Sequence, residues 1–216
     1  LVRGGCVWTG RMPTDTKAAE ASYSRGVGWT TEPFAGSDMR YRIWKAGAKG
    51  IGGLMELPAE AKAGGAPPHW MIYVGVNDVD ASAAQARALG GKGELAPAGN
   101  PSGGLLAVLS DPHGADLAIL RPDGPRPEGP DEPGAVLEVS WRELATLDLG
   151  AARSFYTALF GWEMLKANDM GPLGIYQEFG RFGVPLGGMY EKPADMPFPP
   201  HWLVYARVPD IQASVA

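Results

Sequence analysis

The sequence predicts an α+β protein built from a repeated βαβββ module, and three observations support this fold class. First, a set of residues recurs in the same order at a nearly constant offset, which is the signature of an internal repeat. Second, a segment rich in proline separates the two copies. Third, capping residues and apolar patterns predict the same strand, helix and strand order inside each copy.

The internal repeat covers most of the chain. The recurring residues of the first copy are Trp8, Asp15, Tyr23, Gly28, Trp29, Gly52, Gly53, the segment 67–70, Tyr73, Val76, Asp78 and Ser82. Their counterparts in the second copy are Trp141, Asp148, Tyr156, Gly161, Trp162, Gly187, Gly188, the segment 199–202, Tyr205, Val208, Asp210 and Ser214. Unrelated sequences do not keep this order and spacing by chance.

Each copy divides into modules. We expect a first domain at residues 1–120 with modules at 6–57 and 69–120, a linker at 121–135, and a second domain at 136–216. The linker contains the string RPDGPRPEGPDEPG, whose proline density and charge favour an extended, semi-rigid spacer. The second copy reaches only the position that matches Ala84, so we expect its last module to be incomplete.

The helix of the third module has the clearest pattern. Asp148 is a predicted N-cap, the residues that follow form an apolar stripe, and Gly161 ends the helix. The first module places Ser22 and Gly26 where the third has Phe155 and Leu159, so we expect a less stable helix there. The second module ends in a predicted hairpin of strands 105–109 and 116–120 across a D-P-H-G turn at residues 111–114.

Composition excludes several classes of function. The chain is 45% hydrophobic and 20% charged, which is normal for a packed globular protein. Its net charge of -5, without any cluster of Lys or Arg, makes nucleic acid an unfavourable partner. No apolar run approaches the roughly 20 residues of a membrane span, and no signal peptide is visible. The single cysteine fits a reducing compartment, so we expect a cytoplasmic protein.

The repeated modules, the string D-x-x-A-A-x-x-F-Y-x-x-L-F-G-W from Asp148 to Trp162, and the D-P-H-G turn at Asp111 together carry a resemblance. The sequence resembles the glyoxalase, bleomycin resistance protein and dioxygenase superfamily, also called the vicinal oxygen chelate (VOC) superfamily. It is similar to tandem members that are often labelled hydroxylases. The resemblance implies that paired modules form a cleft, which holds either a divalent metal or an apolar ligand.

The resemblance also implies four metal-ligand positions, on the first and last strands of the paired modules. In the first copy these positions fall on Trp8, Glu56, Met71 and Ala118, and in the second copy three of them fall on Trp141, Glu191 and Leu203. Only one carboxylate of a typical His and Glu set therefore remains in each copy. We expect no cofactor, with a divalent metal as the alternative.

Ten residues are candidates for a functional site. The catalytic candidates are Glu56 and His69, and the ligand-binding candidates are Trp8, Met71, Tyr73, Trp141, Glu143, Glu191, His201 and Tyr205. Glu143 lies two residues beyond Trp141 on the same strand face. It either adds a second carboxylate to Glu191 or is a solvated rim residue.

Two further choices stay open in the sequence. His69 and His201 are either hydrogen-bonded structural residues or ligands, whereas His113 lies in a turn and is expected to be solvated. The aromatic residues and Met71 either clamp a flat ligand or only fill space between modules.

The sequence therefore favours a protein that binds a small apolar or carbonyl-bearing molecule in a Trp-lined cleft, without the standard metal site. The alternative is a metal-dependent lyase or dioxygenase of the glyoxalase type, and a third possibility is an interaction scaffold. Whether the protein is an enzyme is left open; as one, it would be a lyase or an oxidoreductase. The expected partner is a small-molecule ligand, with possible self-association through the incomplete second domain.

Overall fold

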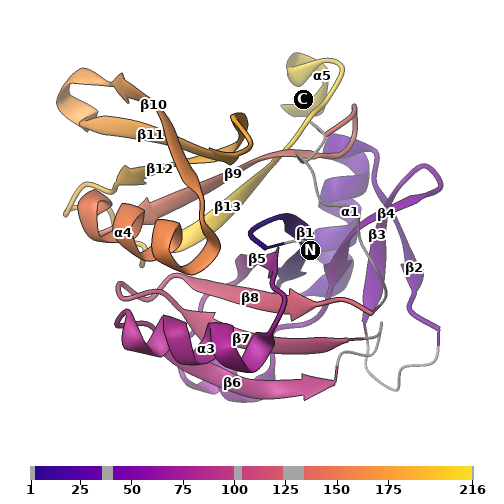
Figure 1. Cartoon of the computed structure of the whole chain (residues 1–216). Helices are drawn as coiled ribbons and strands as arrows, with labels where there is room; N and C mark the ends of the chain where they lie inside the picture. Colours follow the sequence, from indigo (N-terminus) through magenta and orange to yellow (C-terminus); the bar gives the residue numbers. More distant parts are fainter. Residues whose placement is uncertain (1–2, 36–40, 100–103, 124–133, 216) are drawn as a thin grey trace.

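The computed structural model describes residues 3–35, 41–99, 104–123 and 134–215, without the side chains of 94–99. It contains the predicted order of elements in each module, so the α+β fold class is confirmed (Figure 1). The first module comprises β1 (Cys6–Met12), α1 (Thr16–Val27), β2 (Thr30–Pro33), β3 (Arg42–Ala46) and β4 (Lys49–Leu54). After the short helix α2 (Ala59–Ala63), the second module comprises β5 (His69–Gly75), α3 (Val79–Ala88), β6 (Lys92–Gly99), β7 (Leu105–Ser110) and β8 (Asp116–Arg121).

The second copy follows the same plan. Its first module comprises β9 (Val139–Thr146), α4 (Leu149–Phe160), β10 (Glu163–Asp169), the 3-10 turn η1 (Gly171–Leu173), β11 (Ile175–Arg181) and β12 (Val184–Glu191). Its last described elements are β13 (His201–Ala206) and α5 (Ile211–Val215). Among the described residues, no helix has the length and apolar character that crossing a membrane requires.

Local sequence explains where the helices begin and end. Asp15, Asp78 and Asp148 each accept a hydrogen bond from the backbone N–H three residues later, at 2.8 to 2.9 Å. Helices α1 and α4 end at Gly28 and Gly161, whose φ angles of 81° and 72° favour glycine. Six residues of α4 are buried, whereas α1 has no fully buried residue, in keeping with its weaker apolar pattern.

The strands form one sheet of thirteen strands. Strands β1 and β5 pair antiparallel at its centre, with β4 beside β1 and β8 beside β5, both parallel. In the second copy β9 pairs with β12 in parallel and with β13 antiparallel. The two copies meet where Trp202 of β13 lies opposite Trp70 of β5.

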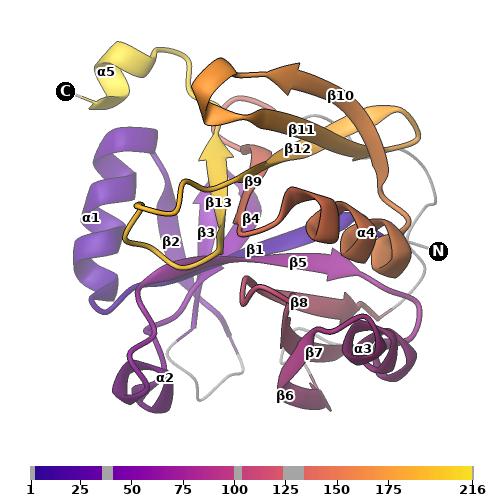
Figure 2. The same ribbon diagram turned by 90° about the vertical axis from the view of Figure 1, so that its left-hand side faces the viewer.

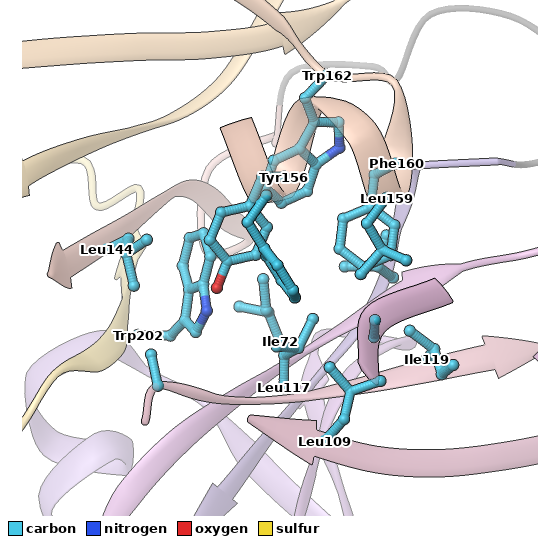
Figure 3. Packing of buried hydrophobic residues seen from close by; sticks show 14 of the residues in the cluster. Ile72, Leu109, Leu117, Ile119, Leu144, Tyr156, Leu159, Phe160, Trp162 and Trp202 are labelled. Atoms are coloured by element: carbon cyan, nitrogen blue, oxygen red, sulfur yellow. The ribbon is translucent and has the colours of Figure 1, made fainter. Parts of the chain in front are cut away.

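A shared core joins the two copies. Helices α3 and α4 lie side by side against the sheet, while α1 and α5 contact each other at another side (Figures 1 and 2). Figure 3 shows Tyr156 of α4 against Trp162 and Trp202 within the largest apolar cluster, which also contains Ile72 and Leu117 of the first copy. Most of the predicted linker, residues 124–133, lies outside the described residues.

A second cluster also crosses between the copies. It gathers Trp29, Trp44 and Trp70 of the first copy with Val139 of the second. The indole Nε1 of Trp29 donates a 2.6 Å hydrogen bond to the carbonyl of Leu137. The sheet, both apolar clusters and this hydrogen bond tie the two copies together.

Candidate functional site

The strand register places several predicted site residues on one face of the first copy's sheet. Trp8 lies opposite Tyr73, Gly10 lies opposite Met71, and Met12 lies opposite His69. Residues directly opposite each other in an antiparallel pair project to the same face. We name this surface the first aromatic face and define it by Trp8, Tyr41, Met71 and Tyr73 with the glycines beneath them. The alternate residues of β5, among them Trp70 and Ile72, project to the other face and join the core clusters.

Glycines provide the space in which the aromatic rings of this face lie. The ring of Tyr41 occupies the place that a β-carbon on Gly53 would take, and a β-carbon on Gly10 would lie 3.1 Å from Cε2 of Tyr73. The indole Nε1 of Trp8 donates a 2.8 Å hydrogen bond to Oη of Tyr41. The repeated glycine pair therefore serves to admit a tyrosine rather than to form a tight turn.

The two phenols of the first aromatic face remain hydrogen-bond donors at neutral pH. Burial raises the pKa of Tyr73 well above its ordinary value of 10.0, and the neighbouring Tyr41 raises it further. Burial also raises the pKa of Tyr41, although the hydrogen bond from Trp8 acts in the opposite direction. Both hydroxyls thus stay protonated and can donate to a ligand carbonyl.

The two repeated histidines make the same local contact. The Nδ1 atoms of His69 and His201 lie 2.9 Å from the carbonyls of Pro67 and Pro199, two residues earlier in each case. A carbonyl partner assigns the proton to Nδ1. This contact leaves Nε2 of each ring available, and Nε2 of His69 is buried without a hydrogen-bond partner among the described residues, so the choice between structural residue and ligand stays open. In contrast, the expectation that His113 is solvated is wrong, because its Nδ1 lies 2.8 Å from Oγ1 of Thr146 across the two copies.

Glu56 lies away from the first aromatic face. Strand β4 ends at Leu54, and the backbone stays extended because the N–H groups of Met55 and Leu57 bond to residues of β1 and the segment after it. Met55 and Leu57 pack with Met71, whereas Leu54 packs in the cluster on the other face. Alternation therefore directs Glu56 to that other side, where it is exposed. The two catalytic candidates, Glu56 and His69, therefore do not project to the same face of the sheet.

The second copy has the same aromatic frame with a carboxylate at its centre. The Nε1 atom of Trp141 donates a 2.7 Å hydrogen bond to Oη of Tyr176, which in turn donates to Oε2 of Glu143 at 2.9 Å. Tyr205 donates to the other oxygen, Oε1, also at 2.9 Å. We name this surface the second aromatic face and define it by Trp141, Glu143, Tyr176, Tyr190 and Tyr205.

Burial and the Glu143 carboxylate keep the phenols of the second aromatic face protonated. Burial is the largest cause that raises the pKa of Tyr176, Tyr190 and Tyr205, and the charge of Glu143 adds to each. The pKa of Tyr205 reaches about 12. At neutral pH the three hydroxyls are therefore neutral.

Of the two alternatives for Glu143, the strand register does not support the one that places its carboxylate beside that of Glu191. Glu143 lies beside Gly188 of β12, and Glu191 is three residues further along, opposite Thr146. An offset of three residues places the two carboxylates on opposite faces of the strand. Glu191 instead accepts a 3.3 Å hydrogen bond from the backbone N–H of Leu149, in the first turn of α4.

Three tyrosines of the two aromatic faces were absent from the sequence candidates, namely Tyr41, Tyr176 and Tyr190. Tyr176 lies in β11 and Tyr41 immediately precedes β3, and the spacing from the repeated tryptophan differs between the copies. The only available signal was the repeated glycine pair, because a glycine in a strand often marks a close approach by another group.

Comparisons with known proteins agree with this architecture. No family model matches the chain. A protein of Mycobacterium tuberculosis named as a glyoxylase, CFP32, is 40% identical over 120 residues, which are 55% of this chain and 44% of CFP32. The anthracycline biosynthesis protein DauV of a Streptomyces species is 29% identical over 98% of this chain and 80% of its own length. The Mn(II)-bound glyoxalase from Novosphingobium aromaticivorans superposes with a TM-score of 0.58 at 18% identity, over 89% of this chain and 62% of that enzyme.

These likenesses support the vicinal oxygen chelate superfamily, whose fold this chain shares. It spans less than half of CFP32 and less than two thirds of the solved glyoxalase.

The residues at the superfamily's metal positions do not fit a divalent ion. The indole N–H of Trp8 is a donor that already bonds to Tyr41, and Met71 and Ala118 offer a buried thioether and a buried methyl group. The fourth position, Glu56, lies on the other side of the sheet. Within the described ranges, no three residues of the types His, Cys, Asp and Glu gather as a possible metal site. A hard or borderline divalent ion requires oxygen or nitrogen ligands that this set does not supply.

Proposed function

We propose that this protein binds a small, flat, apolar or carbonyl-bearing molecule on the first aromatic face, without the divalent metal of the superfamily. The observation that carries the proposal is the pair of protonated phenols, Tyr41 and Tyr73, beside Trp8 and Met71. Aromatic rings and a thioether favour a flat apolar body, and the hydroxyls favour a carbonyl at its edge.

Two further points support this choice of ligand. The central strands place no Asp, Glu, Lys or Arg on this face between the Trp8 and Tyr73 pair and the Met12 and His69 pair. A neutral ligand therefore meets no uncompensated charge. In addition, a relative that aligns with nearly the whole chain is named for the biosynthesis of anthracyclines.

Titration of the full-length protein with acetylnaphthalene, a flat neutral ketone, tests the proposal. We expect saturable binding that shifts the indole N–H NMR resonance of Trp8. The variant Tyr73→Phe should weaken binding by about three- to tenfold, because one hydrogen bond to the ketone is lost. The same variant should change the affinity for naphthalene, which has no carbonyl, by less than about twofold.

Tyr23→Phe is the matched control, because the ring of Tyr23 stacks on Trp29 on the other side of the sheet. It should leave both affinities unchanged. Binding that does not perturb Trp8, or that Tyr73→Phe weakens equally for both probes, would contradict the proposed role of the first aromatic face.

The alternative function is a metal-dependent reaction of the glyoxalase type, since a solved structure with the same fold is described as Mn(II)-bound. Calorimetric titration of Zn and Ni into the full-length protein and into Glu56→Gln separates the two candidates. We expect no tight binding in either protein. Submicromolar binding that is lost in the variant would favour the metal-dependent alternative.

A further inference from the structure

The two aromatic faces share one arrangement of a tryptophan, a tyrosine and a glycine, which we name the aromatic frame, but they differ in charge. Both have a tryptophan N–H that bonds to a tyrosine, and in both that tyrosine lies over a glycine of the last strand, Gly53 or Gly188. The position two residues after the tryptophan is Gly10 in the first copy and Glu143 in the second. The frame is therefore constant while the group at its centre changes from a hydrogen atom to a carboxylate.

A second position changes in the same direction. Ile43 lies opposite Gly53 in the first copy, and Glu178 lies opposite Gly188 in the second. The second aromatic face thus gains two carboxylates at positions that are uncharged in the first copy. Among the described residues, strands β9, β11, β12 and β13 place no Lys or Arg on this face. The neighbouring β10 contains Lys166, two residues before Asn168, and Asn168 donates a 3.0 Å hydrogen bond to Glu178.

The hydrogen bonds of Glu143 hold its carboxylate in place and leave capacity for a ligand. Each of its oxygens accepts one hydrogen bond from a phenol, and a carboxylate oxygen has room for a second. The phenols are neutral donors, so they satisfy the carboxylate without cancelling its charge.

The aromatic rings complete a surface suited to a cation. The rings of Tyr176 and Tyr190 stack with their centroids 6.4 Å apart, and Tyr205 is 42% exposed beside Glu143. The faces of tyrosine and tryptophan rings attract ammonium groups, and a carboxylate supplies a charge-assisted hydrogen bond to the same group.

We propose that the second aromatic face binds ligands that carry a protonated amine on an aromatic or apolar body, and that Glu143 determines this specificity. This inference rests on the proposed function, because it extends the same aromatic frame to the second copy. Gly10 is the corresponding position of the first copy, where Tyr73 lies over the glycine and the proposed ligand is neutral.

Two probes with the same ring test the inference, naphthylmethylammonium and the neutral naphthylmethanol. Both are titrated into the full-length protein, and the indole N–H resonances of Trp8 and Trp141 report which face is occupied. We expect the ammonium probe to shift Trp141 and to bind this face at least about tenfold more tightly than the alcohol. This preference should decline as salt concentration rises, because the site is partly exposed to solvent.

The variant Glu143→Gln keeps the shape of the side chain and removes its charge. We expect it to weaken ammonium binding by about tenfold and to change alcohol binding by less than about twofold. Glu191→Gln is the matched control, since it removes the same charge from β12 on the opposite face. Unfolding curves of both variants establish that each is folded before the titration.

The outcomes separate this inference from the proposed function. Equal affinity of the two probes for the second aromatic face, or an unchanged ammonium affinity in Glu143→Gln, would overturn the role of Glu143. Either result leaves the binding of acetylnaphthalene at Trp8 intact. Conversely, a failure of acetylnaphthalene to perturb Trp8 refutes the proposed function even where the ammonium probe binds at Trp141.

Discussion

The hydroxyl of Tyr156 makes a buried hydrogen bond between the two copies, and its removal has a calculable cost. Tyr156 is completely buried, and its Oη donates to Oδ2 of Asp111 at 3.0 Å. Asp111 is 1% exposed, and its other oxygen accepts from the backbone N–H groups of His113 and Ala115. Burial first, and then the Asp111 carboxylate, raise the pKa of Tyr156 well above its ordinary value.

The variant Tyr156→Phe retains the ring and removes only this donor. A hydrogen bond to a charged group contributes about 1.5 to 3 kcal/mol, and a buried carboxylate oxygen that loses its donor has no water to replace it. We therefore expect the free energy of unfolding to fall by about 2 to 3 kcal/mol. Because the ring still fills its place between Trp162 and Trp202, we expect no additional cost from a cavity.

Urea unfolding followed by circular dichroism measures this change as a lower midpoint at an unchanged slope. Tyr23→Phe is the control, with an expected change within about 0.5 kcal/mol. A double-mutant cycle with Asp111→Asn should show a coupling of about 1 kcal/mol or more, because the two side chains contact each other directly. A loss below about 0.5 kcal/mol in Tyr156→Phe, or strictly additive effects, would refute the assignment of this bond as a link between the copies.

Two further predictions concern the aromatic faces. The raised pKa values of the buried Tyr41, Tyr73 and Tyr156 mean that the folded protein keeps these protons above pH 10, where the unfolded chain releases them. The contribution of these three phenols to the free energy of unfolding is complete below about pH 10. Above that pH it is lost by about 1.4 kcal/mol per pH unit for each phenol. The urea midpoint should therefore fall steeply from pH 10 to 11. A constant midpoint over this range would contradict the burial of the phenols. Gly188→Ala places a methyl group where the ring of Tyr176 lies, so we expect about 1 to 3 kcal/mol of destabilisation and a shifted Trp141 indole resonance. The control Gly64→Ala meets only an ordinary contact of 3.4 Å, and an equal effect in both variants would show that the tyrosine does not need the glycine.

Features set by neighbouring residues could be predicted from the sequence. Asp148 and Gly161 act within a few residues, so α4 begins and ends as expected, and the repeated Asp15 and Gly28 do the same for α1. The hairpin of β7 and β8 forms across the predicted turn for the same reason. The internal repeat then extended these local predictions to the whole chain.

Features set by contacts between distant residues could not be predicted. Tyr41 and Tyr176 reach the aromatic faces from positions whose spacing to the repeated tryptophan differs between the copies. Counting residues also failed for Glu56, because a difference of one residue in a strand changes the face to which a side chain projects. His113 follows a turn that is locally polar, and only the docking of the second copy provides its partner Thr146.

The positions that are the same in the two aromatic faces and the positions that differ have different structural roles. In either copy, the packing of the sheet depends on three residues of the frame. These are the tryptophan, the tyrosine that accepts its hydrogen bond, and the glycine beneath that tyrosine. Exchange of Gly10 or Glu143 changes the charge at the centre of a face and leaves the hydrogen bond between tryptophan and tyrosine in place. In the first copy the missing side chain lets Tyr73 lie over the backbone, and in the second the carboxylate instead bonds to the hydroxyl of Tyr205. One position in each copy therefore decides how the second tyrosine is held and, in the proposed function, which charge a ligand meets. The two positions differ in what an exchange requires, because a side chain at Gly10 would first have to displace the ring of Tyr73, whose Cε2 lies 3.1 Å from the β-carbon position.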